Sequence, residues 1–503
     1  MSTVAPIKAW PSKIRKDLNG EPLEFKDHQI EAIRWLLRNG SGLLYMSPGL
    51  GKSLSALTAT AVLFDSGRAE RVLVICTADI KGNWLEMIED ATYFSAHILD
   101  GDPRQRAVQL AEFDSEILII NYQQVHPHMD ELIRLGFDVV YVDESQAIKN
   151  AGIKTTKAVL KLRSNLPRAR WYPMTATPVE NTQDEIWAQM KLVEGPDMPL
   201  YSYWQWRTRM CRLGGFQNKT VVGIKRERQG DYRKMMKRYS FQRTMDECTD
   251  LPKSKYVMVN VDLSPLQQEL YAQIETDLIE EFRDAEEREK ASALTAALRL
   301  TQLCSTSASI PIDPEDPDGP HHPDESVKLD TVVANIVKLA SEGEKNVVFA
   351  KFIDTLDAIE RRLAEHGLPV FRIDGSVKNI DRQPIVREWR NHSGPSVLIG
   401  TFGTIGKGHT FTAASNSHMV ELLFTSTKMD QADGRTRRLG MNPLKPATIW
   451  EYVCTGTYED RIIDILKRKR KMITEDVATT KIEEKTYQAQ LFDAIFQTEM
   501  EDA

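Results

Sequence analysis

Residues 46–57 read MSPGLGKSLSAL, and this stretch begins at the last residue of the short apolar run GLLYM at 42–46. Gly49 and Gly51 can adopt backbone angles that other residues avoid, so the turn that they form can wrap an anion with its N–H groups. The stretch SLSALTATAVLFD at 53–65 continues with helical spacing. This helix would add the positive end of its dipole to the anion site. The pattern therefore predicts a strand, a phosphate-binding loop and a helix, in that order.

The two residues after the second glycine, Lys52 and Ser53, fit phosphate chemistry. In a phosphate loop the lysine neutralises the β- and γ-phosphates, and the hydroxyl binds Mg²⁺. The G-x-x-x-x-G-K-S/T template has glycine at the position of Met46. A tight strand-to-helix turn with a surface lysine is therefore the competing interpretation.

The stretch VVYVDES at 139–145 favours the phosphate loop. It is an apolar strand that ends in two adjacent carboxylates, and open α/β sheets bind ligands at the carboxyl ends of their strands. Asp143 would hold Mg²⁺, and Glu144 would orient and deprotonate the attacking water. We therefore predict an ATP site that uses Mg²⁺.

Composition places the chain among ordinary globular proteins, with 503 residues, 41% hydrophobic, 27% charged and a net charge of −7. The length predicts two large folding units or three smaller ones. The N-terminus lacks the apolar core of a secretory signal, so we expect an intracellular protein. Five scattered cysteines form no Cys-x-x-Cys pair, which fits a reducing compartment and no zinc site.

Short apolar strands alternate with helical segments twice along the chain, which predicts an α/β fold with two lobes of parallel sheet flanked by helices. A segment rich in proline, aspartate and glycine separates the two series. We expect an N-terminal extension at 1–21, a first lobe at 22–195, a basic and helical insertion at 196–308, a linker at 309–327, a second lobe at 328–457 and C-terminal helices at 458–503.

Taken in order, the motifs resemble the superfamily two helicases, and within them the SWI/SNF family of double-stranded DNA translocases, whose lobes are RecA-like. The similarity runs from about residue 22 to 473. The matching stretches include FKDHQIEAIRWLL, MSPGLGKS, VLVICTADIKGNWLEMI, ILIINYQQV, DESQ, MTATPVENTQDEIWA, NVVFAKFIDTLDAIERRL, FRIDGSVKNIDRQ, GTIGKGHTFTAAS and DQADGRTRRLG. The stretch between the lobes, FQRTMDECTDLPKSKYVMVNVDLSPLQQELYAQI, is the piece most specific to that family.

The resemblance assigns a role to individual residues. It implies that ATP is bound by Gln29, Pro48, Gly49, Leu50, Gly51, Lys52 and Ser53, with Gln29 on the base, and that Mg²⁺ is bound by Ser53 and Asp143. It implies catalysis by Lys52, Asp143, Glu144 and an arginine pair, Arg435 and Arg438. It implies coupling of hydrolysis to DNA through Gln146, Thr175, Thr177 and Gly408. It implies DNA contacts by Thr77, Trp84, Asn121, Tyr122, Ser376, Thr401, Lys407 and Thr410.

Two features depart from the family or narrow it. Gln146 stands where the family usually has histidine, so an amide must replace the hydrogen bond between the carboxylate box and the coupling segment. The sequence GHTFTAAS and the serine of DES are similar to the corresponding motifs of the annealing-helicase (HepA-related) branch. No accessory domain fits in the residues left over, which favours a minimal motor of a microbe or virus.

The basic region 207–238 carries eleven Lys or Arg residues against two acidic ones. Its aromatic residues favour an ordinary core for a helical protrusion over stacking on bases. They are Trp204, Trp206, Phe216, Tyr232 and Tyr239. The block KRKRK at 467–471 is expected to cap a C-terminal helix.

These patterns predict an ATP-dependent translocase on double-stranded DNA. We expect contacts mainly with the phosphate backbone, no membrane partner and a monomer, because both halves of the ATP site lie in one chain. The alternative is a helicase specific for forks or branches, or an annealing helicase. A third reading, of another class, is a nucleotide-gated DNA-binding scaffold with little turnover.

Overall fold

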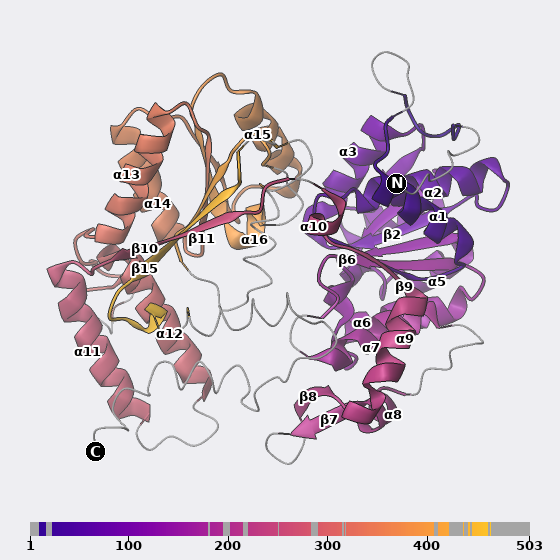
Figure 1. The fold of residues 1–503 in the computed structure, drawn as a ribbon, viewed down its shortest axis with the longest axis horizontal. Helices are drawn as coiled ribbons and strands as arrows, with labels where there is room; N and C mark the ends of the chain where they lie inside the picture. Colours follow the sequence, from indigo (N-terminus) through magenta and orange to yellow (C-terminus); the bar gives the residue numbers. More distant parts are fainter. Residues whose placement is uncertain are drawn as a thin grey trace. The chain divides into compact units, whose positions relative to one another are not determined.

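The computed structural model describes residues 10–16, 23–179, 182–194, 202–214, 220–249, 251–282, 290–313, 316, 318–406, 411–421, 436, 441–442, 445–460 and 463. The chain divides into two compact units, Met1–Asp250 and Leu251–Ala503. Each unit has a central sheet with helices packed on it (Figure 1).

The first unit contains a seven-stranded sheet in which all neighbouring strands are parallel. Its strands are near-continuous apolar runs, as expected for parallel strands covered on both faces. In spatial order they are β3 (Ala96–Ile98), β4 (Ile117–Asn121), β2 (Val72–Cys76), β5 (Val139–Asp143), β6 (Arg170–Thr175), β1 (Leu43–Met46) and β9 (Ser240–Arg243).

Helices connect these strands and cover the sheet. They are α1 (Asp27–Arg38), α2 (Lys52–Asp65), α3 (Lys81–Ala91), α4 (Pro103–Ala111), α5 (Met129–Leu135), α6 (Lys154–Asn165) and α7 (Ile186–Val193). Apolar side chains of α5, α6 and α7 pack on one face of the sheet in a single buried cluster. Short 3₁₀ turns follow three strand ends, namely η1 (Ala78–Ile80), η2 (Tyr122–Gln124) and η3 (Ser145–Ile148), and a further one, η4 (Gln183–Glu185), precedes α7.

A small subdomain follows α7 and returns to the same sheet. It contains α8 (Tyr203–Met210), the antiparallel pair β7 (Cys211–Gly214) and β8 (Thr220–Ile224), α9 (Gln229–Tyr239) and, after β9, α10 (Met245–Cys248). Trp206 and Tyr232 are buried in the core of the first unit, as the sequence favoured, whereas Trp204 is exposed.

The second unit has a six-stranded sheet, again parallel throughout. In spatial order its strands are β10 (Lys255–Val261), β15 (Thr448–Cys454), β14 (Asn416–Met419), β11 (Asn346–Ala350), β13 (Val397–Thr401) and β12 (Val370–Ile373). Its helices are α11 (Pro265–Phe282), α12 (Lys290–Ser305), α13 (Val327–Ser341), α14 (Ile353–Glu365), α15 (Asn379–Asn391) and α16 (Phe402–Ile405).

Alternate residues of β11 divide the core of the second unit into two halves. Val348 and Ala350 pack with α13 and α14, whereas Val347 and Phe349 pack with α12, α15 and α16. Figure 1 shows these helices on the two sides of the sheet. The period of two along a strand produces this division.

The structure confirms the predicted α/β class with two parallel sheets. It places the domain boundary at Asp250 and Leu251, rather than around a separate region at 196–308. The reason is strand pairing: β9 joins the sheet of the first unit beside β1, and β10 joins the sheet of the second unit beside β15. The predicted linker at 309–327 is mostly irregular, and the predicted C-terminal helix lies almost entirely outside the described residues.

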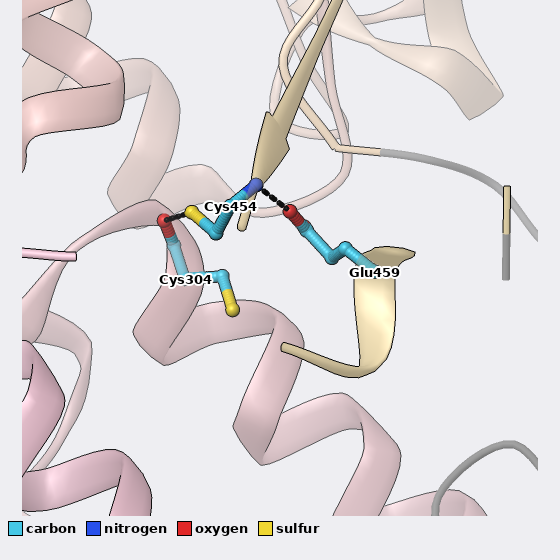
Figure 2. Close-up of side chains that lie close together, drawn as sticks. All are labelled: Cys304, Cys454 and Glu459. Atoms are coloured by element: carbon cyan, nitrogen blue, oxygen red, sulfur yellow. Dashed lines mark hydrogen bonds between the residues drawn. The ribbon is translucent and has the colours of Figure 1, made fainter. Parts of the chain in front are cut away.

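A buried polar cluster closes the core of the second unit (Figure 2). Cys304, Cys454 and Glu459 lie with their sulfur and carboxylate atoms within 4.8 Å of one another. The Lys328 ammonium lies 2.8 Å from both carboxylate oxygens of Glu459, and both side chains are at most 1% exposed. Burial also raises the pKa of the Cys304 thiol well above its ordinary value. The Lys328 ammonium therefore balances the charge of Glu459 beside the protonated Cys304 thiol, and a metal ion is not needed for that purpose.

We predict that the Lys328 to Glu459 pair stabilises the second unit. Lys328→Met leaves the Glu459 carboxylate buried, with a hydrogen bond from the Cys454 N–H at 2.8 Å. Breaking a buried pair in this way costs about 3–5 kcal/mol, so urea titration of the full chain should show a loss of that size for the transition of the second unit. Lys328→Met combined with Glu459→Gln should recover part of it.

The exposed pair Arg228 and Asp231 offers a matched control. Arg228→Gln should change the free energy of unfolding by less than about 0.5 kcal/mol, because exposed pairs contribute little. Equal losses for Lys328→Met and Arg228→Gln would contradict the role assigned to the buried pair.

Candidate functional site

The loop after β1 has the backbone shape that the sequence predicts. Gly49 and Gly51 adopt left-handed angles, with φ of 83° and 80°. Gly51 precedes the first residue of α2, so the helix N-terminus opens directly from the loop. A Cβ at Gly51 would lie 2.2 Å from Nε2 of Gln29. The angle favours glycine at this position, and a Cβ would also displace the end of the Gln29 side chain.

Side chains of helix α1 hydrogen-bond to the loop. The carbonyl of Leu50 accepts hydrogen bonds from Nε2 of His28 at 3.1 Å and from Nε2 of Gln29 at 3.3 Å. Burial lowers the pKa of His28, which favours a neutral ring whose Nε2–H faces the carbonyl. The predicted base-reading residue Gln29 therefore lies against the phosphate loop, while Pro48 lies in the turn itself.

Lys52 and Ser53 begin α2 inside this loop. The Lys52 ammonium donates to the carbonyls of Met46 at 2.7 Å and Ser47 at 3.4 Å. Phosphate oxygens would replace these carbonyls as acceptors. The Ser53 hydroxyl is half-buried and makes no hydrogen bond within the described part of the chain.

The carboxylate pair, Asp143 and Glu144, lies at the end of β5. Burial and the adjacent Glu144 raise the pKa of Asp143 to about 6, while Lys52 and the Trp84 indole act in the opposite direction. Lys52 is therefore near enough to Asp143 to influence its charge. A half-buried hydroxyl and a buried carboxylate are oxygen donors of the kind that Mg²⁺ takes, so Ser53 and Asp143 fit this ion.

Glu144 adopts a left-handed backbone with φ of 51°, the single non-glycine case of positive φ in the described residues. Such a backbone costs roughly 1–3 kcal/mol and is held only where the surroundings enforce it. Here it aims the Glu144 side chain at Gln146, whose Nε2 donates to Oε2 of Glu144 at 2.9 Å.

Gln146 joins the carboxylate pair to the segment after β6. Its Oε1 accepts a hydrogen bond from the Thr175 hydroxyl at 2.6 Å, and Oγ1 of Thr175 accepts one from the backbone N–H of Thr177 at 2.9 Å. We call Glu144, Gln146 and Thr175 the amide relay. An amide thus connects the segment at Glu144 to the segment at Thr175.

A second connection runs parallel to the amide relay through Gln189, which the sequence reasoning missed. Its Oε1 accepts from the Ser145 hydroxyl at 2.7 Å, and its Nε2 donates to the carbonyl of Pro178 at 2.8 Å. Gln189 is fully buried in α7, whose sequence IWAQMKLV is otherwise almost entirely apolar. A lone amide in such a helix is the signal that marks it.

Two residues assigned to DNA contacts turn inward instead. Trp84 and Tyr122 are only 2% and 3% exposed, so their side chains do not reach the surface of the first unit. The Trp84 indole donates to Oδ2 of Asp143 at 2.9 Å. The Tyr122 hydroxyl donates to the carbonyl of Asp143 at 2.7 Å. In this structure the two side chains therefore support the carboxylate pair, and their contact with DNA stays a prediction.

The other predicted DNA-contacting residues that the structure describes lie in loops at strand ends. In the first unit, Thr77 directly follows β2 and Asn121 is the last residue of β4. Both are half-buried. Ser376 and Thr401 lie at the ends of β12 and β13 in the second unit, where Ser376 is exposed. Arg435, Arg438, Lys407, Gly408 and Thr410 lie outside the described residues.

Two family models match the chain in sequence order. The SNF2-related domain matches residues 28–308, which is more than half of the chain. The helicase conserved C-terminal domain matches residues 327–440. In the part of the chain that the structure describes, no helix is both long and apolar enough to cross a bilayer.

Curated relatives match at low identity over most of the chain. An uncharacterized ATP-dependent helicase of Mycoplasma pneumoniae is 24% identical over 463 residues, covering 90% of this chain and 42% of that protein. YwqA of Bacillus subtilis, named a putative ATP-dependent helicase/translocase, is 23% identical over 464 residues, covering 89% of this chain and 48% of that protein. The chain thus spans somewhat less than half the length of these relatives.

Among solved structures, the SWI2/SNF2 ATPase core of Sulfolobus solfataricus in complex with dsDNA aligns over 97% of this chain and 96% of that chain, at 20% identity and a TM-score of 0.42. The family assignment rests on the domain models, which account for both units in order. The chain therefore belongs to the SNF2-related family of ATP-dependent helicases and translocases.

Proposed function

We propose that this chain hydrolyses ATP with Mg²⁺ and uses the energy to translocate along double-stranded DNA, remodelling DNA or protein–DNA complexes as its lobes open and close. The amide relay carries this proposal, because it joins the water-activating carboxylate of Glu144 to the segment at Thr175 assigned to coupling. A nucleotide-binding scaffold without turnover has no need of such a connection.

The residues of the first unit divide the chemistry among them. The phosphate loop binds the anion with backbone N–H groups, and Lys52 neutralises its charge. Bound Mg²⁺ would add charge neutralisation at the phosphates. Glu144 orients the attacking water and accepts its proton, and the hydrogen bond from Gln146 holds that carboxylate in one orientation. Arg435 and Arg438 remain the predicted arginine pair.

A basic groove supports the choice of DNA as the partner. It has a volume of about 600 Å³ and is lined by His126, Lys154, Lys157 and Lys161 together with Met129, Asp130, Gly152 and Ala158. The three lysines lie along α6 and have no ion-pair partner among the described residues. Three unpaired cations on a chain of net charge −7 favour a polyanion at this place.

The groove also adjoins a segment already assigned to DNA. His126 lies five residues beyond Asn121, in the loop that leaves β4. Phosphate contacts of this kind position a duplex without reading its sequence. The proposal therefore includes a phosphate-backbone contact that extends from the end of β4 to α6.

The fork-specific or annealing helicase is the second candidate, favoured by the wording of the GHTFTAAS stretch. The two candidates differ in the DNA that stimulates hydrolysis. Duplex DNA should stimulate a translocase, whereas a model fork should exceed blunt duplex for a fork-specific motor.

We predict that steady-state ATP hydrolysis rises at least tenfold on blunt duplex relative to no DNA, and that Gln146→Met removes most of this rise. Methionine keeps the length of the side chain and loses both hydrogen bonds of the relay. One of these bonds reaches a carboxylate and is worth about 1.5–3 kcal/mol, which corresponds to roughly 10- to 100-fold in rate. Single-stranded DNA and a model fork complete the comparison.

Gln267→Met is a matched control, because Gln267 is a buried amide in the second unit that donates to the carbonyl of Leu303. It should retain duplex stimulation. If ATP turnover stays negligible on every DNA and Lys52→Ala is no slower than the parent chain, the translocase proposal is ruled out and the scaffold is favoured.

We predict that Gly51→Ala abolishes binding of a fluorescent ATP analogue, with a loss of affinity of 100-fold or more. A Cβ there meets Gln29 and forces a residue that avoids φ of 80° to adopt it. Gly67→Ala is the matched control, since Gly67 has φ of 65° with nothing within 4 Å of its Cβ position. Gly67→Ala should cost stability alone. Equal affinities in the two variants would contradict nucleotide binding at this loop.

We predict that Lys157→Gln with Lys161→Gln lowers the salt dependence of duplex binding. Each lost phosphate contact reduces the slope of log affinity against log salt by about 0.9, so the slope should fall by about 2. Arg38→Gln with Arg68→Gln, two exposed cations that precede β1 and β2, should leave it unchanged. A slope that changes equally in both pairs would argue against the groove.

A further inference from the structure

Each of the two segments of the first unit that were assigned to DNA sends one buried aromatic side chain to the carboxylate pair. Nε1 of Trp84 donates to Oδ2 of Asp143 at 2.9 Å. The Tyr122 hydroxyl donates to the carbonyl of Asp143 at 2.7 Å and also to that of Glu144 at 3.3 Å. Both links run from the DNA-facing segments to the residues assigned to Mg²⁺ and water.

The sequence distance between the surface residue and the buried residue is short in both segments. Trp84 lies seven residues beyond Thr77, on the first turn of α3. Helix α3 begins directly after η1. Tyr122 follows Asn121 directly, where β4 ends and η2 begins. A ligand that moves either loop must therefore move the aromatic side chain with it.

The Trp84 ring has little freedom to absorb such a movement. It stacks on Tyr141 with centroids 6.3 Å apart, and Tyr141 stacks on Tyr172 with centroids 5.6 Å apart. The Tyr141 hydroxyl donates to the carbonyl of Ala56 at 2.8 Å, and that of Tyr172 donates to the carbonyl of Leu36 at 2.7 Å. Because close-packed cores switch between discrete arrangements, a shift of α3 must either carry Asp143 along or break the indole hydrogen bond.

The indole bond also decides which lone pairs of Asp143 remain for a ligand. Oδ2 accepts from Trp84, and Oδ1 accepts from the backbone N–H of Glu144 at 2.9 Å. Each oxygen therefore has one protein donor and keeps further capacity to accept or to bind a cation. The direction of that capacity follows the orientation of the carboxylate plane, which these two donors set.

We propose that Trp84 and Tyr122 are positioning residues that transmit the binding of DNA at the first unit to the Asp143 and Glu144 pair, and so link DNA occupancy to nucleotide and Mg²⁺ binding. This proposal rests on the function proposed above. Since coupling between two ligands is reciprocal, nucleotide binding changes DNA affinity through the same two contacts and by the same factor.

The experiment measures binding rather than turnover. The dissociation constant of a fluorescent, non-hydrolysable ATP analogue with Mg²⁺ is determined with and without saturating duplex DNA, and the ratio of the two constants is the coupling factor. We expect a factor of about 5 or more in the parent chain. Trp84→Phe keeps the stacked ring and loses the N–H, and Tyr122→Phe loses the hydroxyl. The factor should fall at least threefold in each.

Two further variants separate a positioning role from a structural one. Trp171→Phe removes another fully buried indole of the first unit, one that donates to a backbone carbonyl, and should keep the parent coupling factor. Trp84→His retains a ring N–H and should restore part of the coupling lost in Trp84→Phe. In a background of Asp143→Asn, Trp84→Phe should add little, because the acceptor that it serves has changed.

The outcomes distinguish this proposal from the function on which it rests. If duplex DNA changes nucleotide affinity in the parent chain and equally in Trp84→Phe and Tyr122→Phe, the transmission route is wrong while the translocase stands. If duplex DNA leaves nucleotide affinity unchanged in the parent chain, the route fails, while the proposed function is still judged by duplex-stimulated hydrolysis. Loss of coupling in the Phe variants, with Trp171→Phe unaffected, supports both.

Discussion

The parallel hydrogen-bond ladder of the first sheet is the constraint on which the site depends. Parallel pairing sends the carboxyl ends of all strands to one edge, where loops from distant parts of the chain meet. The register pairs Tyr45 with Thr175 and Asp143 with Met174, so the ends of β1, β5 and β6 coincide to within about a residue. The phosphate loop, the carboxylate pair and the coupling segment are therefore neighbours before any side chain interacts.

The choice of an amide at Gln146 gives the connection between these ends a fixed direction. A carboxamide donates only from nitrogen and accepts only at oxygen. Here the donor faces Glu144 and the acceptor faces Thr175, and neither role changes with pH in the physiological range. A histidine at the same place would titrate near neutrality and could exchange its donor and acceptor. The hydrogen bonds of Gln146 are thus less sensitive to pH than those of a histidine would be.

Local patterns in the sequence were sufficient for the strands, the glycine loop and the adjacent carboxylates, because each depends on a few consecutive residues. They were insufficient for Trp84 and Tyr122, whose surroundings depend on which strands are neighbours. Those side chains look like surface aromatics in a DNA-contacting segment until the sheet order places β2 beside β5 and β4 beside β2. The return of β9 to the first sheet was equally beyond local patterns, because it depends on pairing across almost two hundred residues with β1.

The subdomain after α7 is joined to η4 by polar contacts at Asp184. Asp184, just beyond the coupling segment, accepts from the Tyr203 hydroxyl at 2.7 Å and lies 3.5 Å from Nε of Arg207. Asp184 is buried, so losing either partner would leave a charge without full compensation. These contacts therefore tie α8 to η4, the turn that precedes α7. In the first unit, polar contacts thus join the carboxylate pair to α3, to η2 and to the end of β6, while Asp184 joins α8 to η4.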